Sequence, residues 1–130
     1  MTFDPNDFKR AMAQFASGVT VVTTKHGDTP IGITASSFTS LSLNPPLVLV
    51  SLDKKLFTHN VIAESGGFAV NVLSARQWEL GMRFAGLKPE IKDRFAGLKT
   101  TTAALGNPIF PESLAWVDCK VWNMYDGGDH

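Results

Sequence analysis

A dense run of hydroxyl side chains is the first feature of the sequence that could do chemistry. The stretch TASSFTSLS, from Thr34 to Ser42, carries six serine and threonine residues in nine positions, and the apolar stretch NPPLVLVSL follows it. Such residues often hydrogen-bond the backbone of their own turns. They can equally line a site for a polar ligand, and the residues alone leave both interpretations open.

Two adjacent cations, Lys54 and Lys55, follow Ser51-Leu52-Asp53 at the end of this apolar stretch. Their position between a predicted strand and a predicted helix suits a phosphate group. Lysine is more often a solvated surface charge, and the sequence does not indicate which lysine would contact the phosphate. Polar edge contacts together with a phosphate clamp are what a bound flavin mononucleotide (FMN) requires.

Other catalytic arrangements have little support. The sequence has no Gly-x-Ser-x-Gly motif to present a serine nucleophile. The histidines His26, His59 and His130 and the single Cys119 lack metal-ligand spacing, and His59 is expected at the surface. No Gly-x-Gly-x-x-Gly motif follows a predicted strand, so a Rossmann fold is not expected. We therefore expect no metal site, and we assign no catalytic acid, base or nucleophile.

Composition limits the class of protein. The chain has 130 residues, of which 44% are hydrophobic, and this is enough apolar material for one domain over residues 1–130. Twelve basic residues balance twelve acidic ones, so neither nucleic acid nor an anionic membrane is an expected partner. The N-terminal residues have no apolar signal segment, and no apolar run approaches the roughly 20 residues that span a bilayer. With a single cysteine, these features favour a cytoplasmic protein.

The elements that would position these residues are short strands with small helices. Strands are predicted at residues 19–24, 31–36, 47–52, 68–73 and 114–125. Helices are predicted after Asp4-Pro5 as far as Gly18, at residues 57–64, and from a Ser74–Gln77 capping box to Gly86. The first helix has an apolar stripe of Phe8, Met12 and Phe15. Because strict βαβ alternation is absent, we expect a mainly β fold, an antiparallel barrel or sandwich.

Several motifs resemble the flavin reductase-like family. The segments FASGVTVVTT, GITASSFTSLSLNPPLVLVSLDKK, GGFAVNVLS, RFAG, DRFAG and GGDH occur in the order typical of that family, from about Phe15 to His130. Residues 34–52 are the most diagnostic part. The resemblance implies an FMN-binding split barrel, which is an antiparallel Greek-key β-barrel with short helices, and it implies a homodimer.

The resemblance also implies positions for the ligands. Thr34, Ala35, Ser36 and Ser37 would lie along the isoalloxazine and ribityl chain, and Ser51, Leu52, Asp53, Lys54, Lys55 and Thr58 would lie near the ribityl phosphate. Phe84, Ala85, Gly86, Arg94 and Phe95 would line or close the flavin site, and His130 would contact the nicotinamide dinucleotide. Two alternatives need no ligand: Phe84 and Phe95 could be core residues, and Arg94 could pair with Glu90 or Asp93 on a helix.

The activity implied by the resemblance is NAD(P)H-dependent flavin reduction. A hydride would pass from NADH or NADPH to FMN or FAD, and the reduced flavin would supply a partner monooxygenase. Such a reaction depends on stacking two rings and requires no protein base at carbon. One alternative is an FMN-binding or storage protein without turnover. A further alternative is a structural β-barrel whose hydroxyl run only satisfies its turns.

Two departures from the family pattern modify these expectations. Leu56 stands where relatives often carry a small hydroxyl residue, which removes one potential phosphate donor. Relatives usually continue beyond the position of His130 and add at least one strand. If nothing replaces that strand, we expect an exposed sheet edge, weaker stability and poor use of the nicotinamide.

Overall fold

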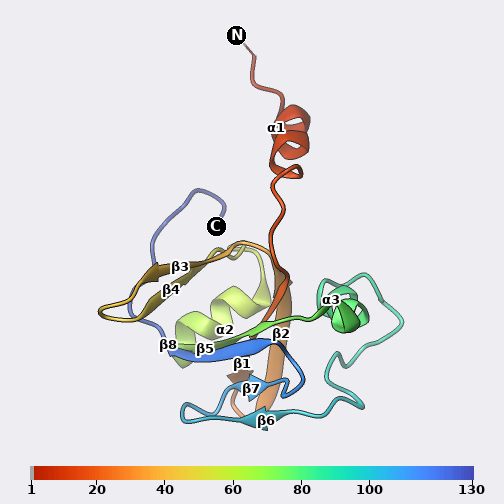
Figure 1. Ribbon diagram of the computed structural model, residues 1–130, viewed down its shortest axis with the longest axis vertical. Coiled ribbons are helices and arrows are strands. Elements are labelled where there is room, and N and C mark those ends of the chain that lie inside the picture. The colour runs from red at the N-terminus through yellow and green to blue at the C-terminus, as the bar shows by residue number, and fades with distance from the viewer. Residues whose placement is uncertain (1) are drawn as a thin grey trace.

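The fold consists of small antiparallel sheets with short helices around them (Figure 1). It is seen in a computed structural model that describes residues 2–130. The described part has eight strands, three α-helices and one 3-10 helix, η1 (Ala75–Gln77). Among the helices of residues 2–130 there is no candidate membrane span. With eight strands and only short helices, the fold is mainly β, as the sequence predicts.

The largest sheet has four antiparallel strands in the order β2-β1-β5-β8. Its strands are β1 (Thr20–His26), β2 (Thr29–Ala35), β5 (Gly67–Val72) and β8 (Ala115–Lys120). A two-residue turn joins β1 to β2, and Gly27 adopts the positive φ of 62° that the first position of a type II′ turn requires. Val21 and Val22 on β1 are fully buried on opposite faces, so this strand has a core on both sides.

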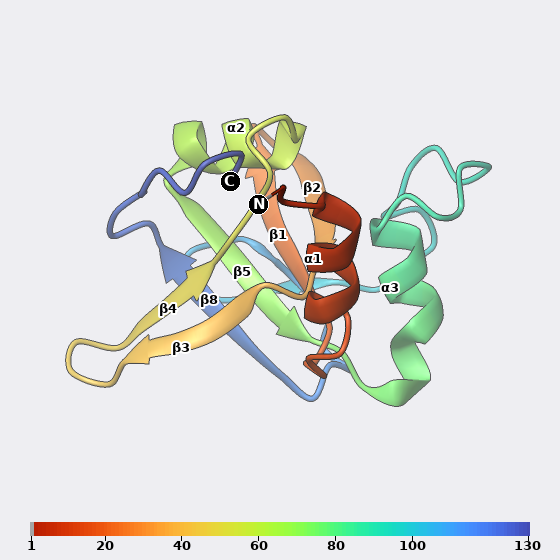
Figure 2. The same cartoon turned by 90° about the horizontal axis from the view of Figure 1, so that it is seen from above.

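Two smaller sheets complete the β structure. Strands β3 (Phe38–Ser42) and β4 (Leu47–Val50) form a hairpin that extends from the body (Figure 2). Strand β6 (Thr101–Thr102) pairs with β7 (Pro108–Ile109) (Figure 1). A register shift between Ser40 and Ser42 interrupts the β3–β4 ladder. In the described part of the chain the three sheets are not joined into one closed cylinder. This openness is consistent with a split barrel.

Each face of the large sheet has its own core. Helix α2 (Phe57–Ser65) contributes Ile62 to a cluster with Val22 and Val70. Helix α3 (Trp78–Phe84) contributes Phe84 to a second cluster with Val21. The predicted capping box before α3 is present, because the N–H of Ser74 donates to Oε1 of Gln77 at 2.8 Å. The two helices therefore cover opposite faces of the sheet.

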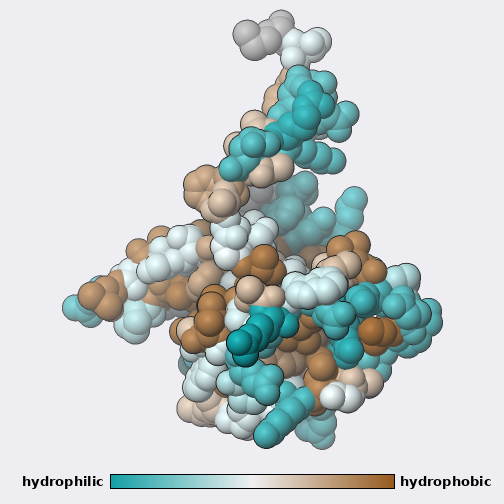
Figure 3. All heavy atoms as spheres, turned by 45° about the vertical axis from the view of Figure 1, so that its right-hand side comes forward, coloured by the Kyte–Doolittle hydropathy of each residue, from teal (hydrophilic) through white to brown (hydrophobic). Residues whose placement is uncertain are grey.

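Helix α1 (Pro5–Met12) stands away from the body (Figures 1 and 3). It begins as predicted, with Asp4 accepting a hydrogen bond from the N–H of Asn6 at 2.8 Å and Pro5 in the first turn. It ends at Met12, so the prediction that it reaches Gly18 is wrong. No residue of α1 is buried, and the apolar stripe of Phe8, Met12 and Phe15 contacts no core.

The last predicted strand is also shorter than expected. Strand β8 ends at Lys120 because its partner β5 begins at Gly67, which pairs with Lys120. One more bond, from the N–H of Val121 to the carbonyl of Gly66 at 2.8 Å, ends the pairing. The β-favouring residues beyond it lack a ladder partner, so residues 121–130 form a loop that turns back toward the start of α2.

Candidate functional site

The hydroxyl run divides into bonded and unbonded side chains. Thr34 lies on β2, and its hydroxyl donates to the carbonyl oxygen of Gly81 at 2.5 Å. Ala35 ends the strand and is buried. Ser36 and Ser37 form the exposed connection to β3, and within residues 2–130 their hydroxyls have no hydrogen-bond partner. Thr34 thus stabilises the fold, whereas Ser36 and Ser37 have donors and acceptors to offer a ligand.

The segment that carries the lysine pair lies beside these serines. The N–H of Ser51 donates to the carbonyl oxygen of Ser37 at 2.9 Å, just beyond the β3–β4 ladder. Asp53 then shapes a tight turn, since its carboxylate accepts from the N–H of Lys55 at 2.8 Å. The hydroxyl residues 36–37 and the lysine segment 51–55 therefore lie side by side in the fold.

The start of α2 presents backbone donors at this place. Leu56 is the N-cap residue, and no side chain accepts a hydrogen bond there. The first N–H groups of a helix have no partner within the helix and carry a partial positive charge. They suit an anionic group such as a phosphate. Thr58, in the first turn of α2, is largely buried.

The two lysines differ in their contacts. The ammonium of Lys54 forms an ion pair with Asp126 and donates to the carbonyl oxygen of Gly128 at 2.5 Å. The backbone N–H of Lys54 also donates to the carbonyl oxygen of Asp129 at 2.9 Å. Lys55 is exposed, and in the described chain its ammonium has no hydrogen-bond or ion-pair partner. Lys55 is thus free to contact an anion.

His130 is held close to the same segment. Its Nδ1 lies 2.7 Å from Oδ1 of Asp129, and its carbonyl oxygen accepts from the N–H of Gly127 at 3.0 Å. The hydrogen bond and the charge of His130 hold the pKa of the Asp129 carboxyl below its usual range. The predicted nicotinamide residue therefore lies next to the predicted phosphate segment, joined to it through Asp129 and Lys54.

A second group of predicted residues packs on the other side of β2. Nη1 of Arg94 donates to the carbonyl oxygen of Phe84 at 3.0 Å and to that of Gly32 at 3.4 Å. Residues 90–94 are not helical, and no ion pair to Glu90 or Asp93 forms in the described chain. The alternative of a helical ion pair is therefore wrong, and Arg94 instead fastens the loop after α3 to β2.

The aromatic members of this group are core residues. Phe84 is fully buried, and its ring lies 4.9 Å from that of Phe95 and 5.5 Å from that of Phe110. Its side chain is thus not exposed to a ligand in this structure. Phe95 is partly buried, whereas Ala85 and Gly86 are exposed beside the Arg94 guanidinium. The predicted flavin residues therefore form two groups, connected through residues 32–35 of β2.

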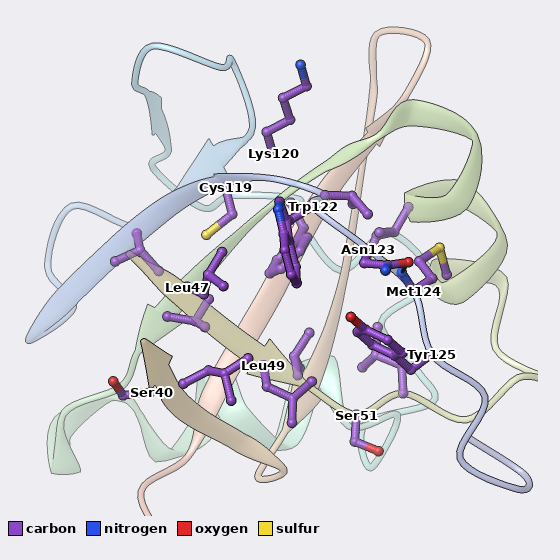
Figure 4. Close-up of a pocket in the computed structure, with 18 of the residues that line it drawn as sticks. Ser40, Leu47, Leu49, Ser51, Cys119, Lys120, Trp122, Asn123, Met124 and Tyr125 are labelled. Atoms are coloured by element: carbon purple, nitrogen blue, oxygen red, sulfur yellow. Dashed lines mark hydrogen bonds between the residues drawn. The ribbon is translucent and has the colours of Figure 1, made fainter. Parts of the chain in front are cut away.

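A cavity of about 1150 Å³ lies between the β3–β4 sheet and the segment from β8 to His130 (Figure 4). Trp122 and Tyr125 project into it, opposite Leu47 and Leu49. Of the predicted site residues, Ser51, Leu52 and His130 line this cavity. Ser40 and Ser42, from the end of the hydroxyl run, also line this mostly apolar cavity.

Sequence reasoning missed several of the cavity residues. Trp122 and Tyr125 fall within the strand predicted at residues 114–125 and were assigned to it, and their exposure becomes visible only in the structure. The expectation that His59 is a surface residue is wrong. It is partly buried on α2 and lines the cavity, and its Nδ1 has no hydrogen-bond partner in the described structure.

The arrangement suits a flavin with a phosphate. The free hydroxyls of Ser36 and Ser37 can bond polar atoms, while the uncapped start of α2 and the Lys55 ammonium can bind an anion. The residues present therefore fit such a group. The described residues contain no cluster that could hold a metal ion.

Comparisons with known proteins identify the family. Residues 12–130 match the family described as "Flavin reductase like domain". The chain is 44% identical over 127 residues to the reductase subunit HsaB of a flavin-dependent monooxygenase from Mycobacterium tuberculosis, covering 98% of this chain and 66% of HsaB. It therefore spans just under two thirds of the length of that relative.

Solved structures agree in fold and in sequence. Nitrilotriacetate monooxygenase component B from Mycobacterium thermoresistibile has a TM-score of 0.90 at 42% identity, over 96% of this chain and 68% of that one. Streptomyces globisporus SgcE6, an NADH:FAD oxidoreductase solved with NAD and FAD fragments, has a TM-score of 0.88 at 36% identity, over 100% and 79%. The chain belongs to the flavin reductase-like family.

Proposed function

We propose that this chain, as one domain over residues 1–130, is an NAD(P)H-dependent flavin reductase. It would transfer a hydride from NADH or NADPH to FMN or FAD and supply the reduced flavin to a partner monooxygenase. The observation that carries this proposal is the meeting of three segments: the free hydroxyls of residues 36–37, the anion-binding features of residues 51–57, and the turn that holds His130. HsaB and SgcE6, named as a monooxygenase reductase subunit and an NADH:FAD oxidoreductase, support it.

We assign the flavin-facing roles to side chains that are free to bond. Ser36 and Ser37 would donate to the polar edge of the flavin, and Thr34 and Ala35 would hold that loop in place through their bonds to Gly81 and Thr20. Ala85, Gly86, Arg94 and Phe95 would close the site from the side of α3, with Phe84 as the buried support beneath them. We divide the roles in this way because Ser36 and Ser37 are exposed, whereas Ala35 and Phe84 are buried.

The phosphate would bind at the start of α2. Lys55 offers an unpaired ammonium, and the first N–H groups of the helix offer backbone donors that no side chain caps. Contacts of charged groups with a helix start contribute about 0.3–1 kcal/mol each at exposed positions. Asp53 fixes this turn through the N–H of Lys55, and Ser51 and Leu52 carry the chain from β4 into it.

A bound flavin supplies the hydride acceptor, so the protein needs only to position the donor. His130, held by Asp129 beside the lysine segment, would contact the nicotinamide dinucleotide. No acid or base in the site has to remove a proton from carbon, which agrees with the absence of a triad motif in the sequence.

We also propose that the chain works as a cytoplasmic homodimer. Helix α1 exposes Phe8 and Met12, and Phe15 just beyond it is also exposed; large apolar groups gathered in this way mark an interaction surface. A second copy is the proposed partner for this surface. Sedimentation velocity of the chain with and without residues 2–17 tests it: a dimer that becomes a monomer agrees, and a monomer in both cases contradicts it.

Steady-state turnover tests the enzymatic proposal against the storage alternative. Loss of NADH or NADPH absorbance is followed with FMN and with FAD, and flavin binding is measured separately by quenching of flavin fluorescence. A reductase binds flavin and oxidises a nicotinamide, whereas a storage protein binds flavin and oxidises neither. A chain that binds no flavin would be a structural barrel.

A further inference from the structure

We propose that Lys54 is a positioning residue, which anchors the turn of residues 126–130 and thereby orients His130 toward the nicotinamide. This inference rests on the proposed function, because it assigns His130 to the nicotinamide. It gives the two adjacent lysines different roles: Lys54 acts on the dinucleotide side of the site, and Lys55 acts on the phosphate.

Three contacts join Lys54 to the turn. Its ammonium pairs with Asp126 and donates to the carbonyl of Gly128 at 2.5 Å, and its backbone N–H donates to the carbonyl of Asp129 at 2.9 Å. These partners are distant in the sequence: Asp126 and Gly128 lie 72 and 74 positions after Lys54, and Asp129 follows Gly128 directly. Lys54 is therefore the main link between the start of α2 and this turn.

The turn has the geometry of a fixed loop. Gly128 has a φ of 86°, which favours glycine. The N–H of Gly127 donates to the carbonyl of His130 at 3.0 Å, and Asp129 Oδ1 lies 2.7 Å from Nδ1 of His130. Movement of Asp129 would consequently move the imidazole. The side chain of Lys54 holds Asp126 and Gly128, the neighbour of Asp129, and its backbone N–H holds Asp129 itself, so Lys54 helps to fix where His130 lies.

The contacts of Lys54 also make it a poor phosphate ligand. An ammonium has three donors, and the Asp126 carboxylate and the Gly128 carbonyl occupy two of them. A phosphate that approached Lys54 would meet the negative charge of Asp126. The Lys55 ammonium has no hydrogen-bond or ion-pair partner within the described chain, so its three donors stay available to a phosphate, although its charge also acts on the nearby Asp129 carboxylate.

Global stability does not depend on this ion pair. The side chains of Lys54 and Asp126 are 42% and 78% exposed, and exposed ion pairs add little to the stability of a fold. The Lys54→Gln variant should therefore keep the melting temperature of the parent chain. Its effect should be confined to the turn and to the use of the dinucleotide.

The test compares Lys54→Gln with Lys55→Gln, and Lys92→Gln serves as an exposed lysine control outside both groups. We expect Lys54→Gln to raise KM for the nicotinamide roughly tenfold while the Kd for FMN stays within twofold. Lys55→Gln should do the opposite and weaken FMN binding. Lys54→Arg should restore part of the nicotinamide KM, because it keeps a cation for Asp126, and Lys92→Gln should change neither constant.

A second readout needs no turnover. Backbone ¹⁵N relaxation reports the order of residues 127–130, and we expect Lys54→Gln and Asp126→Asn to increase their fast motion where Lys55→Gln does not. If the parent chain oxidises no nicotinamide, the proposed function fails, and the relaxation data still decide whether Lys54 orders the turn. An ordered turn in Lys54→Gln, or FMN binding weakened as much as in Lys55→Gln, would overturn the inference.

Discussion

The backbone N–H of Ser51 donates to the carbonyl oxygen of Ser37 at 2.9 Å. This contact brings the end of the hydroxyl run against the start of the lysine segment, across the open end of the β3–β4 hairpin. The two stretches that suggested ligand chemistry separately therefore form one surface.

Ser36→Leu should weaken FMN binding about tenfold and leave thermal stability unchanged. The Ser36 hydroxyl is exposed and has no protein partner in the described chain, so its removal costs the fold nothing. Loss of one hydrogen bond to the ligand accounts for about 0.5–1.5 kcal/mol, and the apolar branch obstructs the surface. Flavin fluorescence titration measures the change, with Ser17→Leu as an exposed control. Unchanged affinity in a folded Ser36→Leu variant would remove this residue from the site.

Gly32→Ala should destabilise the chain by about 1–3 kcal/mol, the usual cost of overpacking a core. A Cβ at Gly32 would lie 2.8 Å from Cε1 of the fully buried Phe84. Gly18 is the matched control, since a Cβ there meets no atom within 4 Å. Urea unfolding of both variants gives the two free energies, and equal values would contradict the close packing of β2 on Phe84.

Arg94→Lys should destabilise the loop after α3 by about 1–2 kcal/mol, within the range for hydrogen bonds from charged groups. A lysine lacks the planar fork that reaches the carbonyls of Phe84 and Gly32 together. Hydrogen exchange of residues 84–98 should become faster, and Lys92→Arg provides the exposed comparison. If exchange in this loop stays as slow as in the parent, Arg94 does not fasten it.

Cys119 should react slowly with a thiol reagent at pH 8. Burial, and to a smaller extent the charge of Asp118, raise the pKa of this thiol, so less of it is present as the reactive thiolate at a given pH. Asp118→Asn should increase the rate slightly by removing the smaller cause. A rate equal to that of free glutathione would show that the thiol is neither buried nor perturbed.

Local patterns predicted much of this fold. The β-branched run of β1, the residues of β5 and the Ser74–Gln77 capping box depend on neighbours in the sequence, and each is present. Strand β3 was not predicted as a strand, because serines and threonines interrupt its apolar alternation. The end of β8 depends on where β5 begins, and no pattern within residues 114–125 carries that information.

The candidate site was predictable as a set of segments but not as a set of contacts. The hydroxyl run and the lysine pair are legible in the sequence, yet their junction depends on the pairing of β3 with β4. The roles of Lys54 and Lys55 are indistinguishable in sequence, since both are lysines in one turn. Their difference arises from partners more than 70 positions away.

The most direct test of the central claim is anaerobic mixing of the purified chain with FMN and NADH, and separately with NADPH. The visible absorbance of the flavin is followed against a protein-free control. We predict rapid bleaching with at least one of the two dinucleotides. If FMN binds to the chain and stays oxidised with both, the reductase proposal is contradicted, and the chain is a flavin-binding domain without hydride transfer.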